Sequence, residues 1–209
     1  MMKTRIALKA LPIPTLLLAC LFWLQGCADD KLSPLSQEAT ILAFGDSLTA
    51  GYGADEADSY PQVLAQLSGR RVVNAGVSGE VTSQGLQRLA TVLEQERPAL
   101  MILLEGGNDI LRNLDQEHTR DNLQQMIELA RDKGVEVVLV SVPRKNLFSD
   151  AAPFYAELAE RYGLPFAEST VAELLRSPRY KSDQVHFNAE GYRRLAQSLY
   201  ELLKEEGAL

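Results

Sequence analysis

Residues 41–52 read ILAFGDSLTAGY, a short apolar run that ends at a glycine and continues directly into a serine. The run from Ile41 to Phe44 is typical of a buried strand, and Gly45 indicates a turn at its carboxyl end. Ser47 is therefore expected at the edge of a sheet. Taken alone, Asp46-Ser47 is also typical of a helix N-cap, because both side chains accept hydrogen bonds from unpaired amides.

The same alternation of apolar runs and helical periods continues along the chain. Strand candidates follow at 71–74, 99–104, 135–142 and, more weakly, 164–167, and helix candidates lie at 59–67, 83–96, 119–133, 152–161 and 189–206. The last helix candidate repeats apolar residues at Tyr192, Leu195, Leu199 and Leu202, a stripe that faces a core. Strands that alternate with helices predict an α/β protein with a mainly five-stranded parallel sheet in three flavodoxin-like layers.

Three further motifs stand where this fold would place a ligand. Ser78-Gly79-Glu80 and Gly106-Gly107-Asn108-Asp109 each follow a strand candidate, and Asp183-Gln184-Val185-His186 precedes the last helix candidate. Ligands of open α/β sheets bind beyond the carboxyl ends of the strands, so we expect these motifs to converge with Ser47 at one edge.

Residues of these motifs match the requirements of nucleophilic catalysis. A serine hydroxyl becomes a good nucleophile when a base takes its proton, and that base works best when a carboxylate orients it. Ser47, His186 and Asp183 can fill these roles. The other histidine, His118, lies at a helix start without such a motif and is expected to be exposed to solvent.

Each motif also has an ordinary structural interpretation. The glycines of 76–79 fit a strand-to-helix turn, and 106–109 fits a tight turn that lacks the lysine of a phosphate loop. The order of all four motifs along one sheet edge favours the catalytic interpretation over four independent turns.

The first 27 residues differ in composition from the rest. Lys3, Arg5 and Lys9 precede an apolar run at 10–24 that contains two prolines, and no acidic residue occurs before Asp29. The run is shorter than the roughly 20 residues of a membrane-spanning helix, so the pattern predicts an export signal. We expect a signal peptide at 1–27, a polar linker at 28–38 and one catalytic domain at 39–209.

The signal ends at Leu24-Gln25-Gly26-Cys27, which resembles the lipobox of bacterial lipoproteins. This resemblance implies lipidation at Cys27 and a periplasmic protein anchored to a membrane. Two alternatives stay open: residues 17–20 fit a similar pattern ending at Cys20, and an ordinary signal peptidase cutting near Gly26 would leave a soluble periplasmic or secreted protein.

Charge and composition restrict the partners. Without the three basic residues of the leader, 18 basic residues remain against 28 acidic ones, a net charge of −10. Nucleic acid binding depends on lysine and arginine, so nucleic acid is excluded as a partner. With two histidines in the chain and no cysteine after position 27, we expect neither a metal site nor a cofactor.

Residues 45–52, 74–79, 106–109 and 183–186 together resemble the GDSL, or SGNH, hydrolases, in particular their bacterial thioesterase, lysophospholipase and arylesterase branch. The resemblance implies that Ser47 is the nucleophile, His186 the base and Asp183 its orienting acid. It further implies that the amides of Ser47 and Gly79 and the side chain of Asn108 form the oxyanion hole.

Two positions depart from this branch: Glu80 replaces a frequent aspartate and Phe187 a common proline, and we expect both to affect the pocket rim. Segment 143–153 also departs and is expected to form part of an acyl-binding wall. The predicted substrate is a small-molecule or lipid acyl ester, including thioesters and lysophospholipids. A deacetylase or acyltransferase of envelope polysaccharide and a non-enzymatic binding lipoprotein are the alternatives.

Overall fold

Strand β1 (Thr40–Gly45) lies in the interior of a five-stranded parallel sheet with the order β2-β1-β3-β4-β5. The computed structural model describes residues 32–144 and 151–209. The other strands are β2 (Arg71–Gly76), β3 (Leu100–Leu104), β4 (Glu136–Val140) and β5 (Phe166–Ala167). The predicted α/β class and parallel sheet are confirmed. The weakest strand candidate, 164–167, pairs over only two residues.

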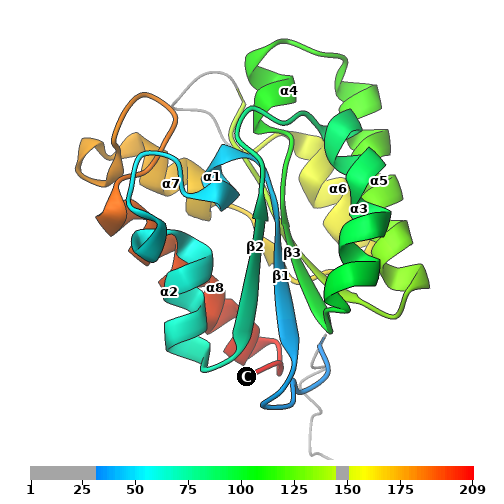
Figure 1. Ribbon diagram of the computed structural model, residues 1–209. Helices are drawn as coiled ribbons and strands as arrows, with labels where there is room; N and C mark the ends of the chain where they lie inside the picture. Colours follow the sequence, from blue (N-terminus) through cyan, green and yellow to red (C-terminus); the bar gives the residue numbers. More distant parts are fainter. Residues whose placement is uncertain (1–31, 145–150) are drawn as a thin grey trace, which may run out of the picture. The chain divides into compact units, whose positions relative to one another are not determined.

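Helices cover both faces of the sheet. Helices α2 (Tyr60–Ser68) and α8 (Ala189–Glu205) pack together on one face, and α3 (Thr82–Glu96), α5 (Gln116–Asp132) and α6 (Pro153–Tyr162) cover the other (Figure 1). These correspond to the five helix candidates. Shorter elements that the periodicity did not predict are α1 (Ser47–Ala50), α4 (Gly107–Leu111), α7 (Thr170–Arg176) and the 3-10 turns η1 (Glu56–Asp58) and η2 (Pro178–Tyr180).

The apolar pattern explains the layers. All five residues of β3 are fully buried, as expected for a strand covered on both faces. Helix α8 buries Tyr192, Leu195, Leu199 and Leu203. The predicted stripe ended at Leu202, which is only partly buried; the stripe instead shifts by one residue, in keeping with 3.6 residues per turn.

Gly45 allows β1 and β3 to end close together. A Cβ atom at this position would lie 1.9 Å from the backbone oxygen of Leu104, so any larger residue would push the two strand ends apart. The short helices that follow these strands, α1 and α4, hold Ser47 and Asn108. Close packing at Gly45 therefore fixes the spacing of two expected site residues.

The described part of the expected linker packs on the domain. Leu32 and Leu35 are buried, and their backbone N–H groups donate to Glu206 and Ala208 after α8. Segment 32–38 therefore differs from a free tether, because these two leucines bury apolar surface in the core. The expected leader and Cys27 lie outside the described residues. Among the residues described, no helix is long and apolar enough to cross a membrane.

Candidate active site

The carboxyl ends of β1, β2 and β3 lie at one edge of the sheet and lead into the loops that carry the expected site residues (Figure 1). Ser47 begins α1 after β1, Gly79 lies between β2 and α3, and Asn108 lies in α4 after β3. The loop before α8 brings Asp183 and His186 to the same place, since His186 contacts Ser47. Residues up to 139 positions apart thus meet at this edge, as the sequence predicts.

Ser47 is the first residue of α1 and is nearly buried, with 8% of its surface exposed. The preceding residue, Asp46, caps this short helix: its Oδ1 accepts a 2.9 Å hydrogen bond from the N–H of Leu48. The capping interpretation of the sequence is therefore correct for Asp46. It leaves the Ser47 hydroxyl available, and Oγ lies 3.0 Å from Nε2 of His186.

The other ring nitrogen of His186 contacts the expected acid. Nδ1 lies 2.7 Å from Oδ2 of Asp183, and Oδ1 accepts 2.8 Å hydrogen bonds from the N–H groups of Val185 and His186. Partial burial acts to raise the pKa of Asp183, but the hydrogen bond from His186 and the two backbone bonds outweigh it, so this pKa is below its ordinary value. An ionised Asp183 favours the tautomer with hydrogen on Nδ1, which leaves Nε2 free to accept the Ser47 proton.

The two residues that follow His186 hold the loop that carries Asp183 and His186. Phe187 is fully buried and packs edge-on against Tyr192 of α8, with ring centroids 5.5 Å apart. Asn188 caps α8 by accepting from the N–H of Gly191, and its Nδ2 donates to the backbone oxygens of Arg179 and Lys181. Phe187 therefore anchors the catalytic loop, and the expectation that it shapes the pocket rim is wrong.

Gly79, in the loop before α3, lies near Asn108 of α4. Gly79 has φ of +80°, a left-handed conformation that favours glycine. Its backbone oxygen accepts a 2.8 Å hydrogen bond from Arg112, and Asn108 donates from Nδ2 to the backbone oxygen of Glu80 at 2.8 Å. The side-chain nitrogen of Asn108 carries two N–H groups. One makes this bond, and Nδ2 also donates a longer, 3.4 Å hydrogen bond to Oδ2 of Asp46.

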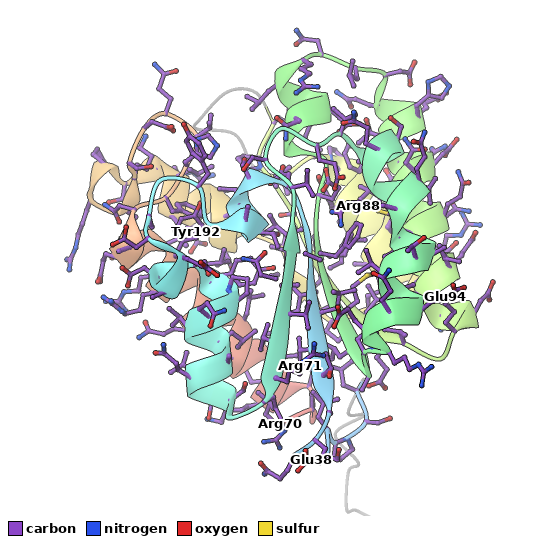
Figure 2. All side chains as sticks on the ribbon, viewed as in Figure 1. Glu38, Arg70, Arg71, Arg88, Glu94 and Tyr192 are labelled. Atoms are coloured by element: carbon purple, nitrogen blue, oxygen red, sulfur yellow. The ribbon has the colours of Figure 1, made fainter. Side chains whose placement is uncertain are left out.

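A partly buried ion pair supports this region from one face of the sheet. Arg88 of α3 donates to both carboxylate oxygens of Glu80, at 2.6 and 2.5 Å, and to the backbone oxygen of Ala75 at 2.8 Å. Its guanidinium lies 4.0 Å from the ring centre of Phe44. Arg88 and Tyr192 lie on opposite faces of the sheet (Figure 2). Glu80 is 5% exposed and does not line the pocket, so its predicted place at the rim is also wrong.

Asp109 forms a second support. Its carboxylate is 3% exposed and accepts hydrogen bonds from the backbone N–H and the hydroxyl of Thr82, at 2.9 and 2.6 Å, with Thr119 at 3.4 Å. These bonds join the start of α3 to α4. The sequence placed Asp109 in a site motif without a role, and it gave no role to Thr82 or Arg88. The sequence signal that could have identified Arg88 was its position beside Gly85 and Leu89, which α3 buries.

Asp46 lies among several acidic groups. Burial raises its pKa from 3.8 to about 6, against the effects of the hydrogen bond from Leu48 and the charge of His186. The negative charges of Asp109 and Glu80 contribute to the rise. Asp46, which directly precedes Ser47, therefore changes its charge in a mildly acidic pH range.

A cavity of about 290 Å³ opens beside Ser47, Asn108 and His186. Apolar side chains form most of its wall, and α7 contributes Val171 and Leu175. Other apolar residues on the wall are Leu48, Ile110, Leu111, Val142, Pro143 and Val185. Of the expected wall at 143–153, Pro143 and Arg144 line the cavity, 145–150 lie outside the described residues, and 151–153 line a separate cavity.

Tyr52 borders the site on the solvent side. Its ring centre lies 4.5 Å from that of His186, and its backbone oxygen accepts a 2.7 Å hydrogen bond from the hydroxyl of Tyr192. The sequence quoted Tyr52 within a motif but did not predict this contact. His118, by contrast, is exposed at the start of α5, as expected.

Comparison with known proteins places this geometry in a family. The family model described as "GDSL-like Lipase/Acylhydrolase family" matches residues 43–194, which include Ser47, Gly79, Asn108, Asp183 and His186.

Named relatives cover most of the chain. Over 158 residues it is 35% identical to "Esterase TesA" of Pseudomonas aeruginosa strain PAO1, a match that covers 71% of this chain and 76% of that relative. Over 159 residues it is 30% identical to "Thioesterase 1/protease 1/lysophospholipase L1" of Escherichia coli strain K12. That match covers 72% of this chain and 76% of that relative.

A solved structure agrees with these matches. The crystal structure of AlinE4, described as an SGNH-hydrolase family esterase, is 35% identical with a TM-score of 0.61, and the match covers 82% of this chain and 97% of that one.

Proposed function

Because the chain belongs to the GDSL-like lipase/acylhydrolase family and is a carboxylic-ester hydrolase, we propose that it works through an acyl-enzyme formed on Ser47. Oγ attacks the carbonyl carbon of the ester while Nε2 of His186 takes its proton. Collapse of the tetrahedral intermediate expels the alcohol or thiol, which receives that proton from His186. Water then attacks the acyl-enzyme by the same route, releasing the acid and restoring Ser47.

The negative charge on the carbonyl oxygen is stabilised by three donors: the N–H groups of Ser47 and Gly79 and the Nδ2 of Asn108. Two 2.8 Å hydrogen bonds support this assignment, from Asn108 to the backbone oxygen of Glu80 and from Arg112 to that of Gly79. They hold Asn108 and the Gly79 loop in place before substrate arrives. Donors fixed in this way need not reorganise during the reaction.

One observation carries the proposal: the unbroken hydrogen-bond sequence from Ser47 through His186 to Asp183, at 3.0 and 2.7 Å. A capping serine and a surface histidine do not require this contact. Its direction also matches the direction in which the proton must move.

The cavity beside Ser47 accommodates the acyl chain. Its volume lies near the lower end of the range of about 300–1,000 Å³ for ligand pockets. We therefore propose that acyl groups from butyryl to octanoyl are preferred over palmitoyl. The name of the Escherichia coli relative, a thioesterase and lysophospholipase, supports activity on thioesters and lysophospholipids as well.

The relatives compared above are named as esterases or as a thioesterase and lysophospholipase, so a polysaccharide deacetylase or acyltransferase and a non-enzymatic lipoprotein are not favoured. For location, we propose export to the periplasm and lipidation at Cys27, supported by the composition of 1–27. Segment 28–38 would then connect the anchor to the hydrolase domain at 39–209, with its part from Leu32 onward packed on that domain.

Hydrolysis of para-nitrophenyl esters, in a series from acetyl to palmitoyl, tests the proposal. Purified protein from Ala28 onward should show turnover that Ser47→Ala abolishes. Asn108→Ala should lower kcat by about 10² to 10³, the usual cost of losing one oxyanion donor. Equal rates for wild type and Ser47→Ala would contradict the nucleophile assignment, and an unchanged rate in Asn108→Ala would contradict the oxyanion assignment.

A further inference from the structure

Glu105 directly follows β3 and is completely buried. Its Oε1 is 3.3 Å from the N–H of Gly106, and its Oε2 has no hydrogen-bond partner among the residues that the structure describes. The backbone oxygen of Glu105 accepts a 2.7 Å hydrogen bond from the hydroxyl of Tyr155 in α6. A carboxyl group is therefore enclosed three residues before Asn108, in the turn that leads to the oxyanion hole.

The charged groups that face Glu105 have the same sign. Asp46 follows β1, Glu80 follows β2 and Asp109 lies in α4, and each is a buried carboxyl group. Arg88 is a cation close to these carboxyl groups, and its hydrogen bonds go to Glu80 and to the backbone oxygens of Gly45 and Ala75.

An ionised Glu105 would thus be a buried charge next to other negative charges, which is strongly unfavourable. Burial, followed by the charges of Asp46 and Glu80, raises the pKa of Glu105 well above its ordinary value.

We propose that Glu105 stays protonated through neutral pH and acts as a positioning residue for the turn that carries Asn108. In its neutral form it holds the N–H of Gly106 without adding negative charge behind the oxyanion hole. An ionised Glu105 would oppose the charge that develops on the substrate oxygen at Asn108. The catalytic part of this inference rests on the proposed function, whereas the protonation of Glu105 does not.

The raised pKa also links Glu105 to folding. The folded protein binds this proton more tightly than the unfolded chain, so the stabilisation is present at low pH and declines as pH rises from the ordinary carboxyl value toward the folded value. Glu105→Gln removes the titration and keeps the shape. Its stability relative to wild type should therefore increase with pH.

Infrared spectroscopy at neutral and mildly alkaline pH tests the protonation directly. Wild type should show the carbonyl stretch of a protonated carboxylic acid, which Glu105→Gln lacks and which persists above the range in which Asp46, with a pKa of about 6, has ionised. Glu160→Gln, which removes an exposed acid of α6, should keep the band. Absence of the band from wild type would overturn the proposal, and this titration can be read from wild type alone if Glu105→Gln fails to fold.

The pH profile of kcat/KM tests the positioning role. The kcat/KM of the wild type should fall at least threefold over the alkaline range in which the infrared band disappears. The profile of Glu105→Gln should show no such alkaline decrease. Superimposable profiles would overturn the positioning role. A failure of the proposed function is distinct: an active Ser47→Ala would contradict the nucleophile and leave the infrared result unchanged.

Discussion

The hydroxyl of Thr82 donates a 2.6 Å hydrogen bond to Oδ1 of Asp109, and this bond joins the first turn of α3 to α4. Both residues are buried, and Thr82 also accepts a 3.0 Å hydrogen bond from Asn122 of α5. The loop with Gly79 precedes Thr82, and Asn108 precedes Asp109. This one contact therefore links the segments that hold two proposed oxyanion donors.

Replacing Thr82 with valine should weaken that link. The change keeps the branched shape and leaves Oδ1 of the buried Asp109 without its short bond, which should lower the free energy of unfolding by about 1–3 kcal/mol. Because the oxyanion donors lose support, kcat should fall more than KM changes. Thr91→Val, at an exposed position of α3, is the matched control. Urea unfolding and ester kinetics measure the two quantities. Equal losses of unfolding free energy and kcat in both variants would exclude a specific role for the Thr82–Asp109 hydrogen bond.

Removing the side-chain charge of Arg88 should lower the free energy of unfolding far more than removing that of Arg71. Arg88→Met leaves the buried Glu80 unpaired, which should cost about 3–5 kcal/mol. Arg71 pairs with Glu96 at 2.7 Å on the surface, where 58% of the Arg71 side chain is exposed. Arg71→Met should therefore change the free energy of unfolding by about 1 kcal/mol or less. Chemical denaturation of both variants gives the comparison, and similar losses would refute it.

The pKa of Asp46 predicts a pH dependence of stability. Its folded value of about 6 is above the ordinary 3.8, so the proton stabilises the folded protein at low pH and that contribution declines between about pH 4 and pH 6. Asp46→Asn cannot titrate, and its stability relative to wild type should rise by about 3 kcal/mol across this interval, at 1.36 kcal/mol per pKa unit. Urea unfolding at several pH values measures the difference. A constant difference would contradict the raised pKa.

Lipidation should depend on Cys27 alone. Cells that express the full chain are labelled with a palmitate analogue, and the wild-type protein should carry the label. Cys27→Ser should lose it because the serine cannot form the thioether, whereas Cys20→Ser should retain it. Label lost in Cys20→Ser but kept in Cys27→Ser would assign the anchor to the earlier cysteine. An unlabelled wild type would indicate ordinary signal cleavage.

The sequence predicted the sheet and the convergence of the site because both follow from local patterns. Apolar runs such as 41–44 and 99–104 report burial on both faces, and parallel strands place their carboxyl ends at one edge. The short helices α1, α4 and α7 were missed, since four to seven residues contain too little periodicity to identify a helix.

The supports of the site could not be read from the sequence in the same way. Arg88 and Glu80 are eight positions apart, and Thr82 and Asp109 are 27 apart, so only the folded chain shows that they are partners. Phe187 was expected to affect the pocket rim because it stands after His186 where the resembling branch commonly has proline, yet its side chain is buried in the core. Position beside a catalytic residue in sequence does not specify which way a side chain points.

Mass spectrometry after reaction with an alkyl para-nitrophenyl phosphonate tests the central claim most directly. The reagent transfers its phosphonyl group to an activated serine, so wild type should gain one adduct, located on the peptide that contains Ser47. Ser47→Ala should remain unmodified, and His186→Ala should react far more slowly because no base takes the proton. An adduct on another residue, or equal labelling of Ser47→Ala, would contradict the assignment of Ser47 as the nucleophile.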